Sequence, residues 1–177
     1  VGAFGAGMTE LKSRGLDEAI IEAARSGIPL LGICLGMQML FESSRENGWH
    51  AGLAIIPGEI MPIPPKDSKN AIQRKVPHIG WNELVPPETK TMWEGTCLDD
   101  IDSGDFVYFV HSFMAVPRKA SDILAQCFYS GLPITAAVSC GNVAGVQFHP
   151  ERLAKDNGIS NTIKTNLLHK IYQTKIY

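Results

Sequence analysis

The segment from Ile28 to Gln38 constrains this chain more than any other. Its apolar first part, residues 28–33, predicts a short buried strand, and helix-forming residues follow from Met37. Between them lies Gly32-Ile33-Cys34-Leu35-Gly36, the thiol counterpart of the G-x-S-x-G turn, in which flanking glycines relieve crowding around a strained nucleophile. Such a turn holds the sulfur at the carboxyl end of the strand, where the positive end of the next helix favours the thiolate. By itself the motif also fits a buried core cysteine between two apolar elements.

A second motif lies 115 residues further along the chain (149 − 34), in the segment 145–151. It predicts an apolar strand that ends in polar groups. Pro150 pushes His149 toward an extended conformation, in which side chains two residues apart point to the same side. Glu151 can then orient one ring nitrogen of His149 and leave the other free for Cys34. A thiol, an imidazole and a carboxylate form a nucleophilic triad, although the segment alone would also fit a surface turn.

These two motifs resemble the signatures of the class I (triad-type) glutamine amidotransferases. Two further stretches, Pro77–Asn82 and Tyr108–Phe113, resemble the glutaminase subunits of imidazole glycerol phosphate synthase, which supply ammonia during histidine biosynthesis. The four motifs occur in the family's order, and the similarity runs from Val1 to the last expected helix. The resemblance implies a single glutamine amidotransferase domain over residues 1–177.

The expected fold class is α/β: a doubly wound, mostly parallel sheet with helices on both faces and an antiparallel excursion in the middle. Helices are predicted at Met8–Arg14 and Asp17–Ser26, each followed by a glycine, and from the cysteine turn to about Ser43. The predicted strands after the nucleophile strand are Gly58–Ile63, Ile79–Val85, Phe106–Val110, Ile123–Tyr129, Ile134–Ser139 and Val143–Phe148. An amphipathic helix over Gly158–Tyr172 is expected to close the fold.

The start of the chain, Val1–Gly5, resembles the middle of the family's Pro-Gly-Val-Gly strand. In the family this strand supplies part of the oxyanion hole, so the resemblance implies that role for Val1 and Gly2. We therefore expect the sequence to be a fragment that lacks the N-terminal strands and helices of the domain.

The resemblance also implies a set of substrate-binding residues. Gln38 would contact the glutamine, and Glu46 matches an acidic residue that holds the substrate amino group. The backbone at His111, Ser112 and Phe113 would bind the glutamine carboxylate, with Phe113 standing where the family often has tyrosine. Two alternatives stay open: a solvated loop carboxylate for Glu46, and a buried, hydrogen-bonded core histidine for His111.

Three residues are expected at a protein interface. Trp81 beside Asn82 is typical of interface anchors, and the resemblance implies that both face the synthase partner, as does Arg152. Packing of Trp81 in the core is the alternative. Leu153 departs from the family, which usually has a serine there.

Composition excludes several other classes. The 177 residues are enough for a sizeable core, the net charge is −2, and no basic block or long apolar stretch predicts binding to nucleic acid or a membrane. Four cysteines without C-x-x-C spacing argue against a zinc or redox motif, and a free reactive thiol fits the reducing cytoplasm.

The expected reaction is glutamine hydrolysis by covalent catalysis. Cys34 attacks the carboxamide, the backbone N–H of Leu35 and the Val1–Gly2 strand hold the oxyanion, and His149, oriented by Glu151, transfers the protons. By resemblance, ammonia passes to a (β/α)8-barrel cyclase subunit, and no metal or organic cofactor is needed. Two rivals stay open: a paralogous glutaminase that feeds another synthase, and a truncated, non-enzymatic binding subunit.

Overall fold

A computed structural model of the chain describes residues 2–66, 73–88, 93–99 and 101–152. The expected closing helix over Gly158–Tyr172, the departure at Leu153 and the oxyanion residue Val1 lie outside the described residues. No helix in the described part of the chain is long and apolar enough to cross a lipid bilayer.

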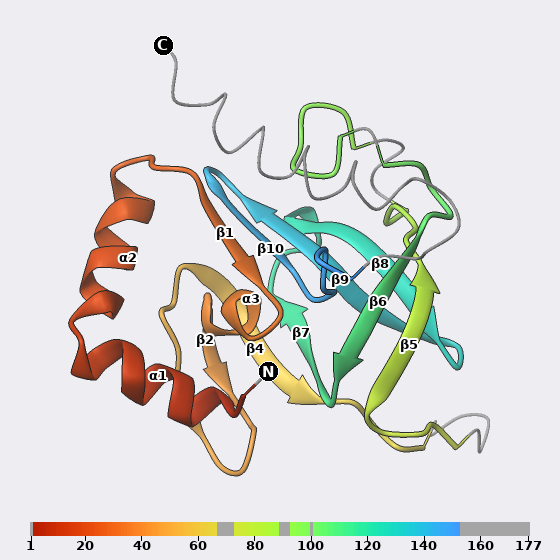
Figure 1. Cartoon of the computed structure of the whole chain (residues 1–177), viewed down its shortest axis with the longest axis horizontal. Coiled ribbons are helices and arrows are strands. Elements are labelled where there is room, and N and C mark those ends of the chain that lie inside the picture. Colours follow the sequence, from red (N-terminus) through yellow and green to blue (C-terminus); the bar gives the residue numbers. More distant parts are fainter. Residues whose placement is uncertain (1, 67–72, 89–92, 100, 153–177) are drawn as a thin grey trace.

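The described chain begins with two helices, α1 (Phe4–Ser13) and α2 (Leu16–Arg25). Gly15 and Gly27 follow them with φ angles of 64° and 76°, in the left-handed region that favours glycine. Both predicted helices are therefore confirmed, with the first beginning four residues earlier than expected. They lie together at one end of the molecule (Figure 1).

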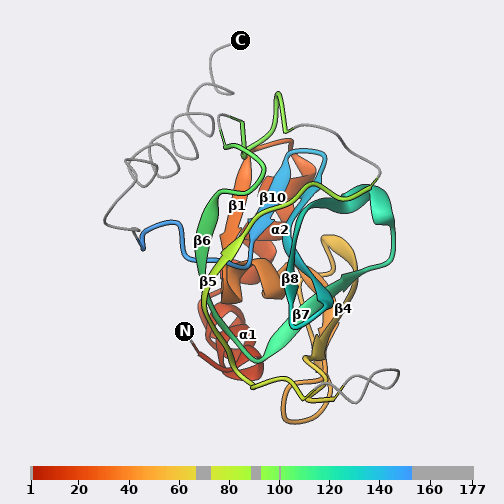
Figure 2. The same cartoon turned by 90° about the vertical axis from the view of Figure 1, so that its right-hand side faces the viewer.

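Three sheets make up the rest. The first has the order β1-β10-β9-β8, with bounds Leu30–Ile33, Val143–Val146, Leu132–Cys140 and Ile123–Tyr129. The second has the order β3-β2-β4-β7, with bounds His50–Ala51, Phe41–Ser44, Ile56–Pro62 and Phe113–Pro117. The third pairs β5 (His78–Glu83) with β6 (Phe106–His111) and lies at the end opposite α1 and α2 (Figures 1 and 2). The short helix α3 (Leu35–Met39) follows β1, and the 3-10 turn η1 (Ala120–Asp122) precedes β8.

The prediction of a mostly parallel sheet is wrong for the described residues. Only the pairs β1–β10 and β2–β4 are parallel there, and the remaining pairs are antiparallel. Connections of two residues, Ser130-Gly131 and Gly141-Asn142, join β8 to β9 and β9 to β10. They are far shorter than the dozen or more residues that a parallel crossover needs. Helices on both faces are likewise not seen in this part of the chain, because α1 and α2 lie together on one side.

The helix predicted to run to about Ser43 is also shorter than expected. It ends at Met39, and residues 41–44 form strand β2. The carbonyl groups of Met39, Leu40 and Phe41 accept hydrogen bonds from backbone N–H groups of residues 53–56 at 2.9–3.1 Å. Those carbonyls are therefore unavailable to a continuing helix, and tertiary pairing overrides the local helical propensity.

Two apolar clusters form the core. One lies among β6, β8, β9 and β10 and includes Phe109, Leu124 and Phe148. The other joins α1 and α3 to the second sheet and includes Phe4 and Met37. The cysteine turn connects β1 to α3, so both of its sides are anchored by packed elements.

The two glycines that flank Cys34 have different structural roles. A Cβ added to Gly32 would lie 2.7 Å from the carbonyl carbon of Gly36 and 2.7 Å from the backbone nitrogen of Met37. A Cβ added to Gly36 would meet nothing within 4 Å. The first glycine is therefore required by the close approach of β1 and α3, and the second is not.

We predict that Gly32→Ala lowers the free energy of unfolding by about 1–3 kcal/mol, because a rigid backbone must shift to admit the methyl group. Gly36→Ala is the matched control, and it should be neutral or stabilise by up to about 1 kcal/mol, since Gly36 lies in a helix. Urea unfolding followed by circular dichroism measures both. Equal stability of the two variants would contradict this account of the turn.

Candidate active site

Cys34 occupies a strained turn at the carboxyl end of β1. Its φ of 51° and ψ of −109° are unusual for any residue other than glycine, which matches the predicted nucleophile turn. Its backbone N–H donates to the carbonyl of Val146 at 2.7 Å, and its carbonyl accepts from the N–H of Gln38 at 3.1 Å. These bonds hold the cysteine beside the end of β10.

The surroundings of the sulfur work against its ionisation. Burial raises the pKa of the Cys34 thiol, and the negative charge of Glu151 raises it further, whereas the backbone N–H of Leu35 lowers it. The expectation that the start of the helix favours the thiolate is met by the N–H of Leu35, which lowers the pKa. The net shift of the Cys34 pKa is nevertheless upward. Burial is the largest of these effects and outweighs the N–H of Leu35.

The structure places the carboxylate of Glu151 against the imidazole of His149. The distance from Nδ1 to Oε1 is 2.7 Å, and because a carboxylate only accepts, Nδ1 carries the hydrogen. In a neutral ring Nε2 is then a bare acceptor, and it is buried without a hydrogen-bond partner. No hydrogen bond joins it to Cys34 in the described structure; in substrate-free sites such contacts are often long. Together these groups could serve as nucleophile, base and orienting carboxylate.

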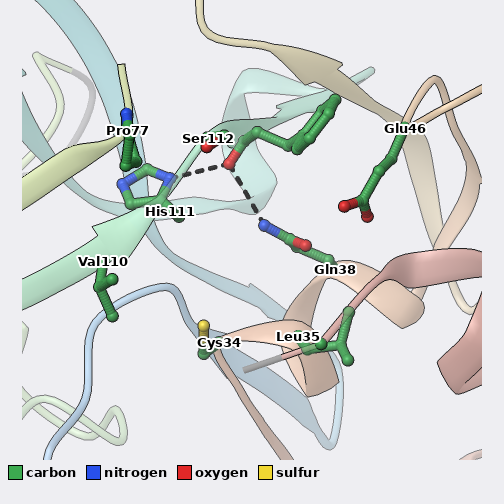
Figure 3. Close-up of a pocket in the computed structure, with 10 residues that line it drawn as sticks. Cys34, Leu35, Gln38, Glu46, Pro77, Val110, His111 and Ser112 are labelled. Carbon is green, nitrogen blue, oxygen red and sulfur yellow. Dashed lines mark hydrogen bonds between the residues drawn. The ribbon is translucent and has the colours of Figure 1, made fainter. Parts of the chain in front are cut away.

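A cavity of about 230 Å³ opens above Cys34. Seven other residues that the sequence singled out line it: Gly2, Leu35, Gln38, Glu46, His111, Ser112 and Phe113. The sulfur points toward the space between Gln38 and His111 (Figure 3). Pockets for drug-sized ligands measure roughly 300–1,000 Å³, so this smaller cavity suits a ligand the size of an amino acid.

The amide of Gln38 is tied into the protein. Its Nε2 donates to the carbonyl oxygen of Phe113 at 3.2 Å and to Oε1 of Gln147 at 2.9 Å (Figure 3 shows the first bond). Both N–H bonds are therefore used, and only Oε1 of Gln38 is left to meet a ligand. Gln147 in turn donates from Nε2 to the sulfur of Cys34 at 3.7 Å. The sequence analysis assigned no role to Gln147. Its position as a polar residue inside an apolar segment was the feature that could have indicated one.

Glu46 has a structural partner that the sequence did not suggest. Its Oε2 accepts the backbone N–H of Phe4 at 2.7 Å, which caps the first turn of α1. The alternative of a solvated loop carboxylate is therefore wrong. Glu46 also lines the cavity that contains the thiol.

His111 forms a buried pair with His78. Nδ1 of His111 lies 2.8 Å from the carbonyl oxygen of Phe113, so that nitrogen must be the donor. Its Nε2 therefore accepts a hydrogen bond from Nδ1 of His78 at 3.0 Å. Burial lowers the pKa of each ring to about 4, so both rings are neutral near pH 7. His111 is thus both a hydrogen-bonded core histidine and a wall of the cavity.

The three residues expected at an interface lie outside the cavity. Trp81 is 38% exposed and packs edge-on against Tyr108 with ring centroids 5.5 Å apart, so the alternative of a core tryptophan is wrong. Arg152 places its guanidinium carbon 4.5 Å from the centre of the Tyr108 ring. Asn82 donates from Nδ2 to the carbonyl of Phe128 at 2.9 Å.

The described cysteines other than Cys34 do not belong to a metal-binding cluster. Cys34 and Cys127 are buried, whereas Cys97 and Cys140 are partly exposed. Among residues 2–66, 73–88, 93–99 and 101–152, no group of three or more His, Cys, Asp or Glu side chains could hold a metal ion.

Comparison with known proteins identifies close relatives. The family model "Glutamine amidotransferase class-I" matches residues 4–170. Imidazole glycerol phosphate synthase subunit HisH 1 of Legionella pneumophila (strain Lens) is 46% identical over 152 residues, covering 86% of this chain and 71% of that protein. Subunit HisH of Sulfurimonas denitrificans is 45% identical over 159 residues, covering 90% and 72%. A glutamine amidotransferase structure from Thermotoga maritima shares the fold, with a TM-score of 0.53 at 16% identity, covering 93% of this chain and 57% of that one.

We predict that the His78–His111 pair makes the fold sensitive to mild acid. Because burial lowers both pKa values from 6.5 to about 4, the unfolded chain binds protons more readily between those values. The neutral rings contribute fully to the free energy of unfolding above pH 6.5. This contribution, on the order of 3 kcal/mol for each ring, is lost as the pH falls toward 4. Urea unfolding at pH 7 and pH 5 measures the loss, and His78→Phe, which preserves ring stacking, should reduce it. Equal acid sensitivity in the wild type and His78→Phe would refute this role.

Proposed function

Because this chain belongs to the class I glutamine amidotransferase family, and within it to the HisH subunits of imidazole glycerol phosphate synthase, we propose that it is a glutaminase. It converts glutamine to glutamate and ammonia for the synthase that acts in histidine biosynthesis. One observation carries the proposal: a cysteine in a strained turn lies at an amino-acid-sized cavity, and it shares a sheet edge with the segment in which a carboxylate orients His149.

The first chemical step forms a thioester. The Cys34 sulfur attacks the side-chain carbonyl carbon of glutamine, and the thiol proton passes to the free Nε2 of His149. The oxyanion that develops accepts a hydrogen bond from the backbone N–H of Leu35 and a second one from the backbone at Val1 or Gly2, of which Gly2 lines the cavity. Removing one such donor typically costs a hundredfold or more in rate.

His149 then completes both halves of the reaction. It returns the proton to the leaving nitrogen, so that the C–N bond breaks and ammonia departs. Next it takes a proton from water, which attacks the thioester, releases glutamate and restores the thiol. Glu151 keeps Nδ1 protonated throughout, which leaves Nε2 as the atom that moves the protons.

The cavity supplies groups for each end of the substrate. Oε1 of Gln38, the only part of its amide that is not tied to the protein, accepts an N–H of the glutamine carboxamide. Glu46 binds the substrate ammonium with the oxygen that α1 does not use. The backbone at His111, Ser112 and Phe113 receives the substrate carboxylate.

The ammonia is delivered to the cyclase subunit, a (β/α)8 barrel that makes imidazole glycerol phosphate and aminoimidazole carboxamide ribotide. The outer face of the β5–β6 pair suits this partner, because Ile79, Trp81 and Phe106 are 56%, 38% and 54% exposed on it. Arg152 stacks on Tyr108 beside Trp81 and adds a positive charge to the apolar surface. A large aromatic, an arginine and exposed apolar side chains are what protein interfaces enrich.

The first test is glutamate release from glutamine by the purified chain, alone and with the cyclase subunit and its nucleotide substrate. We expect the partner to stimulate release, and Cys34→Ala to lower it by at least about a thousandfold, because the thioester forms on the Cys34 sulfur.

Cys140→Ala is the matched control, because Cys140 is a partly buried thiol in β9 outside the cavity lining, and it should keep full activity. Undiminished glutamate release by Cys34→Ala would show that the nucleophile is wrong.

The second test concerns the partner face. Trp81→Ala should weaken the cyclase subunit's affinity by about tenfold or more, since buried tryptophans are frequent interface hot spots, and leave the unstimulated rate unchanged. Trp49→Ala is the control, because Trp49 is 61% exposed and directly precedes β3, which contacts α1 and β2. Titration of partner-stimulated glutamate release measures both. An unchanged midpoint for Trp81→Ala would remove this face from the proposed interface.

A further inference from the structure

Gln147 is a polar side chain among buried apolar residues. It is fully buried, between Val146 and Phe148, which are fully buried as well. Burying an amide without partners costs several kcal/mol, so its hydrogen bonds must be made inside the protein. They are: Oε1 accepts from Gln38, Nε2 donates to Cys34, and the backbone N–H donates to the carbonyl of Ala136 at 2.8 Å.

The orientation of the Gln147 amide is fixed by the backbone carbonyl of Phe113, to which it is linked through two hydrogen bonds of Gln38. The carbonyl of Phe113 can only accept, so the group of Gln38 that faces it is the NH2 group. The second hydrogen of the same NH2 group points at Gln147, which must answer with its oxygen. The NH2 group of Gln147 is therefore the end that faces the sulfur, and no rotation of the amide can reverse this without leaving a donor opposite a donor.

This donor acts on the nucleophile itself. Nε2 of Gln147 lies 3.7 Å from Sγ of Cys34, within hydrogen-bonding range for sulfur. A thiolate is a much stronger acceptor than a thiol, so the bond strengthens when the sulfur loses its proton. It works against burial and the charge of Glu151, which both raise the pKa of Cys34, and with the N–H of Leu35, which lowers it.

Resting on the proposed glutaminase function, we propose that Gln147 is a positioning residue for the nucleophile. Its amide, oriented by Gln38 and the Phe113 carbonyl, holds the Cys34 sulfur in one rotamer and stabilises the thiolate that attacks the substrate. Gln147 transfers no proton, which distinguishes it from His149. Gln38 thereby has a second task besides contact with glutamine.

The test is the rate at which Cys34 is alkylated by iodoacetamide between pH 7 and pH 10, followed by mass spectrometry of the peptide that contains Cys34. Gln147→Leu removes the donor at similar size. Gln147→Glu keeps the acceptor for Gln38 but replaces the donor with a second oxygen. We expect Gln147→Leu to react about tenfold more slowly at a given pH, the effect of one hydrogen bond to a charged group, and Gln147→Glu more slowly still.

Two controls separate this effect from loss of structure. Gln126→Leu makes the same chemical change at a partly exposed glutamine on β8 and should leave the alkylation profile unchanged. Gln147→Leu leaves one N–H of Gln38 without an acceptor, so the double variant Gln38→Leu/Gln147→Leu removes that orphan and restores folding if the single variant is unstable. The double variant should show the same slow alkylation.

The outcome does not depend on glutaminase activity. Slower alkylation in folded Gln147 variants supports the positioning role even if glutamate release is never observed. An alkylation profile identical to the wild type in Gln147→Leu, Gln147→Glu and the double variant would overturn it, whatever the enzyme assay gives.

Discussion

The parallel pairing of β1 with β10 is the interaction on which the site depends. It sets Gly32 opposite Gly145 and brings the two strands to a common carboxyl edge, where Cys34 follows one and His149 the other. The N–H of Cys34 extends this pairing by one hydrogen bond, which it donates to the carbonyl of Val146. Residues more than a hundred positions apart are thus held within one small region by backbone bonds, before any side-chain contact contributes.

Close backbone approach makes that pairing possible. Side chains at either glycine would collide with α3: a Cβ on Gly32 would lie 2.7 Å from the Met37 nitrogen, and a Cβ on Gly145 would lie 2.7 Å from Cγ of Met37. The space that the glycines leave is filled by the fully buried Met37 side chain. Packing of α3 onto both strands therefore sets the turn that strains Cys34, and the strain is stabilised by burial rather than by local sequence preference.

A buried polar network is built on this scaffold. The carbonyl of Phe113 accepts from both His111 and Gln38, and through Gln38 it orients Gln147 toward the sulfur. In an apolar interior each of these groups would be costly if unpaired, so the network has few arrangements open to it. The same low-polarity surroundings keep the His78 and His111 imidazoles neutral near pH 7 and raise the pKa of the Cys34 thiol.

The sequence by itself determined the elements whose signals are local: the glycine-flanked cysteine turn, the two helices that Gly15 and Gly27 follow, and most strands. It also determined the pairing of His149 with Glu151, since both lie on one extended segment. Only the tertiary structure decided that residues 41–44 form a strand, because carbonyls before them are taken by residues 53–56. It alone decided the largely antiparallel pairing of the described strands and the role of Gln147, because register and burial depend on segments distant in the chain, which local patterns do not record.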